Sequence, residues 1–320
     1  MAAYIIRRLI QSVFTIFGVM LVTFLLFRVV PGDISANYVS AKLGKEARQA
    51  WLVNHGLDKP RISNPACRYE FWKAPFWDTQ FCRHVYDCVT FQSRSYATNE
   101  RLIDIIAQKA PYSLAITVPG LAMSWVLSMI VSCLVAYYRG SWIDRAGVFI
   151  SVLGMCIPFL AYMIVGQWIA FQIYPPAAYG LRFKMNIYVP VLISVVAGIG
   201  SHVRFYRTII LDEVNRDYVR TAMAKGVPLP GILFQHVLKN CMLPILTDLV
   251  LAIPFLIMGV MLLENFFGIP GLGSLIVNSV SARDVPIITA LTFLTALVYT
   301  LGLLVTDVLY GVFDPRIRLR

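Results

Sequence analysis

The chain has 320 residues, of which 58% are hydrophobic and only 14% are charged, and its formal charge is +11. A mean hydropathy of +0.69 excludes an ordinary soluble domain of this size. The positive charge does not indicate a nucleic-acid partner, because the basic residues fall largely in short segments between long apolar runs.

The apolar runs are long enough to cross a lipid bilayer. A helix needs roughly 20 mainly apolar residues to cross a hydrocarbon core about 30 Å thick. Six such runs occur, approximately over residues 9–30, 112–138, 146–174, 187–210, 243–263 and 285–310. Backbone polar groups in lipid must bond within their own segment, so each run is expected to be helical. The sequence therefore predicts an all-α polytopic membrane protein with six transmembrane helices.

The first run follows Arg7 and Arg8, as in a signal peptide, but it has no small-residue cleavage pattern, so a retained span is expected over residues 1–30. Residues 31–110 then form a long, aromatic-rich segment that predicts a small folded cap. Near its end, residues 101–108 alternate apolar and polar side chains. This pattern fits an amphipathic helix at the membrane surface or a helix buried in the cap.

Three cysteines lie in the predicted cap: Cys67, Cys82 and Cys88. Two of them could form a disulfide if the cap faces an oxidising compartment, and a Cys82–Cys88 bond would close a short loop. With His84 the three also make a possible Cys3His metal set, although the spacing fits no zinc motif. Free thiols are the remaining alternative.

The short basic segments predict the topology. With six spans they all fall on one side, which the positive-inside rule makes cytoplasmic. They are Arg7/Arg8, Arg139/Arg145, the stretch 204–239 and Arg316/Arg318/Arg320. Both termini are then cytoplasmic, the cap is external, and residues 111–320 form a membrane core with a cytoplasmic loop at about 211–241.

That cytoplasmic loop contains a predicted amphipathic helix over residues 212–227. Apolar residues recur on one helical face, while Gly226 supplies a left-handed cap and Pro228 prevents continuation. A second helical stretch is expected over residues 231–240. A short helix across the cytoplasmic ends of the spans could dock a soluble partner or simply connect two spans.

Residues 217–226 resemble the cytoplasmic docking loop of permease subunits of bacterial ATP-binding-cassette importers, in the dipeptide/oligopeptide and nickel branch. The general importer motif begins Glu-Ala-Ala, whereas Arg220, Thr221 and Ala222 stand here, which suits that branch. Three further stretches are similar to the branch and follow in the same order: residues 4–9 with 31–33, 270–273 with 282–286, and 314–318. The resemblance covers nearly the whole chain.

The resemblance implies a permease that forms a translocation path with a second homologous permease. It also implies two cytoplasmic ATPase subunits, an external substrate-binding protein, a bacterial inner-membrane location and peptide cargo, with a nickel chelate or another solute as alternative. The implied docking residues are Arg216, Asp217, Tyr218, Arg220, Thr221, Ala222, Ala224, Lys225 and Gly226. The chain has no Gly-x4-Gly-Lys-Ser/Thr loop, so ATP and Mg are expected in the ATPases, and this chain is expected to be non-catalytic, without cofactor or metal.

Three carboxylates fall in or near the later spans, where an ionised side chain is expensive unless it is paired or hydrated. Glu264 and Asp307 are expected to anchor opposite helix ends at the interfaces. Asp248, about a turn from Pro244, either lines the translocation path or pairs with a base of a partner subunit. An ion-coupled secondary transporter could use all three, but no internal repeat supports it. An intramembrane enzyme would need a metal cluster or a nucleophile–base set within the spans.

Overall fold

A computed structural model describes residues 2–29, 38, 44–62, 77–173, 187–258 and 261–313. In these ranges the regular elements are helices, and one isolated antiparallel bridge joins Arg94 and Arg101. Five helices are long and apolar enough to cross a membrane, and a bent pair can supply a sixth. The prediction of an all-α polytopic membrane protein is confirmed.

The structure describes the following helices, in chain order. They are α1 (Ala2–Phe24) with a π-helical turn (Leu25–Val29), α2 (Gly44–Asn54), α4 (Gln80–Thr90), α5 (Leu102–Tyr137), α6 (Trp142–Cys156), α7 (Phe159–Ile173), α8 (Tyr188–Val214), α9 (Asp217–Ala224), α10 (Leu229–Gly231) with a π-helical turn (Ile232–Val237), α11 (Leu238–Met258), α12 (Met261–Phe266), α13 (Leu272–Ala282) and α14 (Val285–Phe313).

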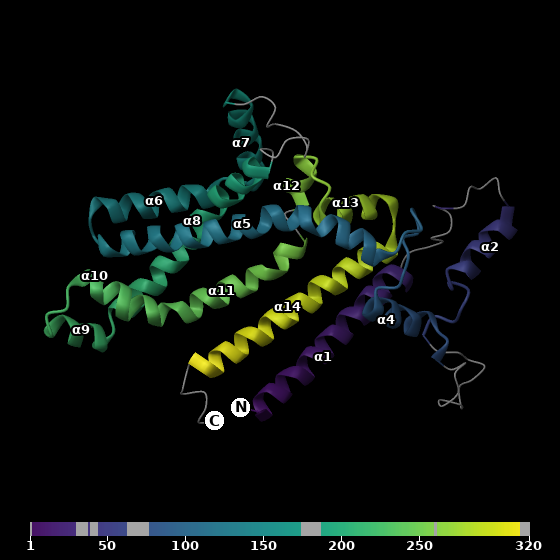
Figure 1. Cartoon of the computed structure of the whole chain (residues 1–320), viewed down its shortest axis with the longest axis horizontal. Helices are drawn as coiled ribbons and strands as arrows, with labels where there is room; N and C mark the ends of the chain where they lie inside the picture. The colour runs from purple at the N-terminus through teal and green to yellow at the C-terminus, as the bar shows by residue number, and fades with distance from the viewer. Residues whose placement is uncertain are drawn as a thin grey trace.

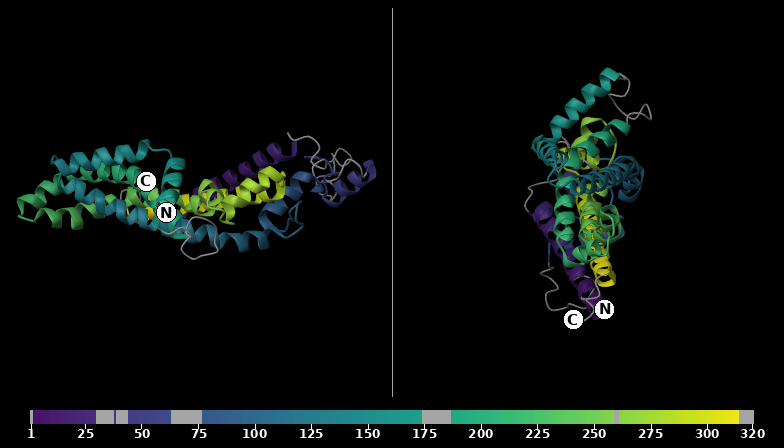
Figure 2. Two further views of the ribbon diagram at one scale, coloured as in Figure 1. Left: turned by 90° about the horizontal axis from the view of Figure 1, so that it is seen from above. Right: turned by 90° about the vertical axis from the view of Figure 1, so that its left-hand side faces the viewer.

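The molecule is elongated, with α9 at one end and α2 and α4 at the other (Figure 1). The start of α1 and the end of α14 lie together in all three views (Figures 1 and 2). An ion pair joins them, because Arg8 Nε lies 3.0 Å from Asp307 Oδ2. This proximity agrees with an even number of transmembrane helices, which places the two ends of the chain on the same side of the membrane.

The helices α5 and α8 pack closely at the centre of the bundle because small residues face the contact. Buried small residues recur at every fourth position of α5, at Gly120, Ser124, Ser128 and Ser132. A Cβ added at Gly120 would lie 2.4 Å from Ser194 Oγ of α8. Small side chains at this spacing allow transmembrane helices to approach and to form interhelical hydrogen bonds.

The second span begins earlier than predicted. Residues 101–108 form no separate surface helix, because α5 runs without interruption from Leu102. Leu102 and Ile105 are buried against α13 and α14, including Leu272 and Leu291. The apolar face of this stretch is therefore covered by other helices rather than by lipid headgroups.

The third predicted span, 146–174, is broken. Helices α6 and α7 meet at an angle of 98°. The break lies at Pro158, which has no N–H to donate and disfavours helical backbone at the preceding residue, and Ile157 is extended with ψ 122°. Helix α6 lies along α8, while α7 projects away from the bundle (Figure 1).

The fifth predicted span is displaced. The expected separate stretch 231–240 continues into α11 through a π-helical turn, so this span begins at Ile232 rather than at 243. The segment between the predicted fifth and sixth spans contains a further helix, α13, of 11 residues. At about 1.5 Å per residue this helix is too short to cross the bilayer.

Candidate functional site

The predicted docking segment contains a shorter helix than expected. Residues 212–214 belong to the end of α8, and α9 spans only Asp217–Ala224. Its apolar side is held tightly, with Val219 fully buried and Ala222 nearly so. Both belong to a core cluster that includes Tyr206 of α8 and Ile232 of the π-helical turn before α11. Helix α9 is thus anchored to the ends of two transmembrane helices.

The end of α9 is set by backbone hydrogen bonds of the Schellman type. The N–H of Gly226 donates to Met223 O at 3.0 Å, and the N–H of Val227 donates to Ala222 O at 3.2 Å. Gly226 has a φ of +74°, as expected for a left-handed cap. A Cβ added there would meet no atom within 4 Å, so the position requires glycine for its backbone conformation and not for space.

The opposite face of α9 and its flanks are polar and exposed. The side chain of Arg220 is 77% exposed, and its ion pair with Asp217 is long, at 3.6 Å. Tyr218 is half-buried and donates its O–H to Glu213 Oε1 at 3.0 Å; burial raises the pKa of this phenol. The structure therefore brings the predicted docking residues together on one short element. Those that are exposed are Arg216, Asp217, Arg220, Thr221, Ala224, Lys225 and Gly226.

A buried ion pair that the sequence interpretation missed supports this end of the molecule. Arg207 of α8 reaches Asp144 Oδ1 with Nε at 2.8 Å and with Nη2 at 2.7 Å. The other carboxylate oxygen accepts the N–H of Gly140 at 2.9 Å. The α5–α6 turn is thereby tied to α8 about two turns before the end of α8. The sequence signal that could have identified Asp144 is its position three residues after Ser141, which caps the start of α6.

Glu264 is not an interfacial anchor, because only 1% of it is exposed. Its Oε1 accepts the Ser113 hydroxyl of α5 at 2.6 Å, and its Oε2 accepts the N–H of Ser274 at 3.1 Å. Burial raises the pKa of Glu264, while these hydrogen bonds act in the opposite direction. The carboxylate caps the start of α13 and joins it to α5. A Cβ at Gly271 would lie 2.3 Å from Oε2, so only glycine fits beside it.

The other two predicted carboxylates lie elsewhere. Asp307 pairs with Arg8 at the end of α14. Asp248 Oδ2 accepts the Tyr206 hydroxyl at 2.9 Å and lies 3.9 Å from His202 Nε2. The partners named here for Asp248, Glu264 and Asp307 belong to different elements, so the geometry offers no support for a proton relay through the three.

Cys82 and Cys88 do not form the short disulfide loop expected from their spacing. Both lie in α4, six residues apart, so helical rise alone separates them by about 9 Å. A disulfide requires Cα atoms within roughly 7 Å. Cys67 lies outside the described residues, so a pair that includes it stays a prediction. Within the described ranges no three His, Cys, Asp or Glu residues gather to hold a metal.

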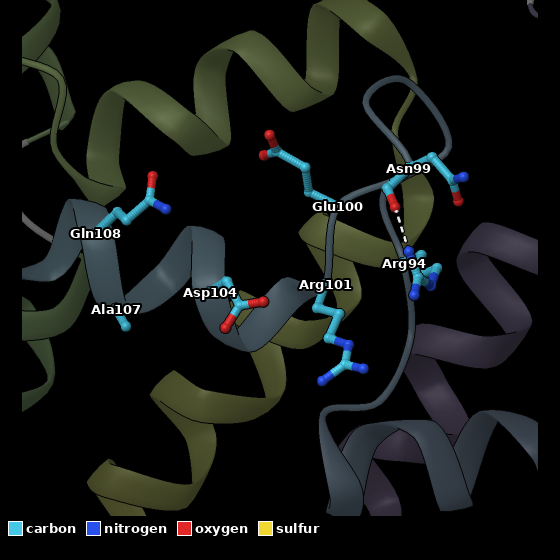
Figure 3. A pocket seen from close by; sticks show the side chains of 7 residues that line it. All are labelled: Arg94, Asn99, Glu100, Arg101, Asp104, Ala107 and Gln108. Atoms are coloured by element: carbon cyan, nitrogen blue, oxygen red, sulfur yellow. Dashed lines mark hydrogen bonds between the residues drawn. The ribbon is translucent and has the colours of Figure 1, made fainter.

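A polar pocket of about 620 Å³ lies beside the start of α5, away from α9 (Figure 3). Asp104, Ala107 and Gln108 line it from α5, and Arg94 donates to the carbonyl oxygen of Asn99 at 2.8 Å on the other side. Glu100 and Arg101 complete a lining with charges of both signs. The sequence interpretation identified none of these as site residues.

The chain is similar to known transport proteins over its whole length. Residues 111–319 match the family described as "Binding-protein-dependent transport system inner membrane component", and residues 1–117 match the N-terminal region of such components. It is 30% identical to the oligopeptide transport system permease protein AppB of Bacillus subtilis, over 99% of each chain. It is 29% identical to the dipeptide permease DppB of Lactococcus lactis, over all of both chains, and 29% identical to the glutathione permease GsiC of Escherichia coli, over 99% of each. The resemblance found in the sequence is confirmed, and the chain belongs to the family of binding-protein-dependent transport system inner membrane components.

Proposed function

We propose that this permease carries peptides, taking its energy from ATP hydrolysed by partner subunits. Three relatives that align over nearly the entire chain are named for oligopeptide, dipeptide and glutathione transport, and all of these cargoes contain peptide bonds. The ion-coupled alternative is not favoured, because the three carboxylates on which it depended contact different side chains: Tyr206, Ser113 and Arg8.

The observation that carries the ATP-driven role is the form of α9. One face is buried in the ends of transmembrane helices, the other is exposed and charged, and a left-handed glycine stops the helix sharply. A rigid element of this kind can transmit a conformational change of a soluble partner to the transmembrane helices, because its buried face is packed against α8 and the start of α11. Two ATPases, one on this chain and one on a second homologous permease, are the partners that we infer.

We infer that α9 and both termini face the cytoplasm, and that the cap faces outward in a bacterial inner membrane. The basic segments and the Arg8–Asp307 pair support this orientation. An external binding protein would then deliver cargo to the end that carries the polar pocket beside α5. ATP and Mg would bind in the ATPases, and this chain would hold neither a cofactor nor a metal.

Co-purification and reconstitution test the proposal. A tagged chain should bring down a second permease and ATPases. Proteoliposomes that contain this complex should take up tri-alanine only when ATP is present on the side of the ATPases and the binding protein is present on the opposite side. Ionophores should leave this uptake intact. Uptake that follows a proton or sodium gradient and does not need ATP would refute the ATP-driven function. A ligand other than a peptide, identified on the binding protein by mass spectrometry, would refute the peptide cargo.

A further inference from the structure

Three neighbouring transmembrane helices bring polar side chains together. Ser124 of α5 lies 3.2 Å from His202 Nδ1 of α8, and His202 Nε2 lies 3.9 Å from Asp248 Oδ2 of α11. Tyr206, one turn further along α8, donates to the same Oδ2 at 2.9 Å. His202 precedes the end of α8 at Val214 by about 18 Å of helical rise, and it lies towards the cytoplasmic end of the predicted fourth span, 187–210. Ionisable side chains within transmembrane segments are costly and usually serve a function.

Asp248 differs from the other membrane-associated carboxylates in lacking a strong partner. Asp144 and Asp307 each pair with an arginine, at 2.7 and 3.0 Å, and Glu264 accepts hydrogen bonds from a hydroxyl and a helix N-terminus. Over the residues that the structure describes, Asp248 has no lysine or arginine within 4 Å, and its nearest basic neighbour is His202, at 3.9 Å. Its negative charge is therefore poorly compensated by this chain.

The carboxylate is also the accessible end of the group. Ser124 and Tyr206 are buried, whereas the side chains of Asp248 and His202 are 31% and 27% exposed. Tyr206 holds one carboxylate oxygen, Oδ2, and the described residues provide no hydrogen bond to the other. The network thus orients Asp248 and leaves Oδ1 available to a donor outside this chain.

We propose that Asp248 binds the α-ammonium group of a peptide on the translocation path, with Tyr206 and His202 as positioning residues. The inference rests on the proposed peptide transport. A peptide with a free N-terminus is mostly cationic at that end at neutral pH, since its pKa is about 8. Attraction between an ammonium and a carboxylate is several times stronger in a low-dielectric site than in water, so a single carboxylate can bind the ammonium group.

The test measures uptake by proteoliposomes that hold the full chain with its partner permease, ATPases and binding protein. The probes are tri-alanine and N-acetyl-tri-alanine, which lacks the ammonium. Asp248→Asn keeps an acceptor for the Tyr206 hydroxyl but removes the charge, and should lower the maximal rate for tri-alanine at least tenfold. Asp248→Glu should retain most of the rate. Tyr206→Phe keeps the charge and should lose less, about threefold. Ser201→Ala is the control, because Ser201 is exposed and bonds only within its own helix.

The preference for tri-alanine over the acetylated probe separates binding from a structural role. The binding protein is the same in all samples, so its own preference cancels when variants are compared. Asp248→Asn should lower the preference at least tenfold, with normal amounts of assembled complex. An unchanged preference and rate beside normal wild-type uptake would overturn this inference alone. Loss of the second permease from the Asp248→Asn complex would show that Asp248 pairs with that subunit and would also overturn it. Absence of wild-type peptide uptake would overturn the proposed function as well.

Discussion

Replacing Gly226 by valine should weaken the association of the ATPases with this permease while leaving its insertion normal. Gly226 has a φ of +74°, and a Cβ at this position would meet no atom within 4 Å. The cost is therefore backbone strain without a clash, about 1–2 kcal/mol. If docking requires the capped form of α9, this strain reduces the affinity by roughly 5- to 30-fold. Gly226→Ala should lie towards the lower end of this range, because alanine is not β-branched.

The assay is the dissociation constant of purified ATPases from the permease pair in nanodiscs. Gly268→Val is the matched control, because Gly268 also has a positive φ, +64°, and open space around it, but lies between α12 and α13, away from α9. Its strain should be similar and its effect on ATPase affinity negligible. Unchanged affinity in Gly226→Val, or an equal loss in Gly268→Val, would refute the assignment of α9 as the docking helix.

Three further outcomes are expected. Arg220→Glu should abolish ATPase-coupled uptake at normal expression, because an exposed interface charge governs register and partner choice; uptake equal to wild type would contradict this. In a background without native cysteines, an impermeant thiol reagent on intact cells should label Asn99→Cys but not Asn215→Cys, and the reverse pattern would invert the topology. Burial raises the pKa of Glu264, so the folded protein keeps this proton to a higher pH than the unfolded chain does, and thermal stability should fall as pH rises through that raised pKa. Glu264→Gln should flatten this dependence in detergent melting curves; an unchanged slope would exclude Glu264 as its source.

The stop of α9 could be predicted from the sequence because it is a local property. The two hydrogen bonds that close it join residues between 222 and 227, and the glycine that permits them lies in the same segment. The start of α9 could not be predicted as accurately as its end. Residues 212–214 have the same amphipathic pattern but continue α8, and only the packing of α8 against its neighbours distinguishes them.

The prolines show why the bounds of the spans were less certain. Pro111 and Pro119 lie inside α5, which continues through both, whereas the chain turns by 98° near Pro158. A proline in the interior of a helix removes one backbone hydrogen bond, but neighbouring helices can compensate for the loss. The sequence shows where a proline weakens the helix, but it does not show whether neighbouring helices compensate for the lost hydrogen bond.

The sequence by itself determined the all-α membrane fold, the approximate spans and the family, because apolar run length and short motifs are properties of contiguous residues. Only the tertiary structure decided the partners of the charged groups. Glu264 meets Ser113 across 151 positions, Arg207 meets Asp144 across 63, and Tyr206 meets Asp248 across 42. Such pairs depend on which helix faces pack together, and that is set by the fit of small and large side chains along whole helices, which no single segment of the chain contains.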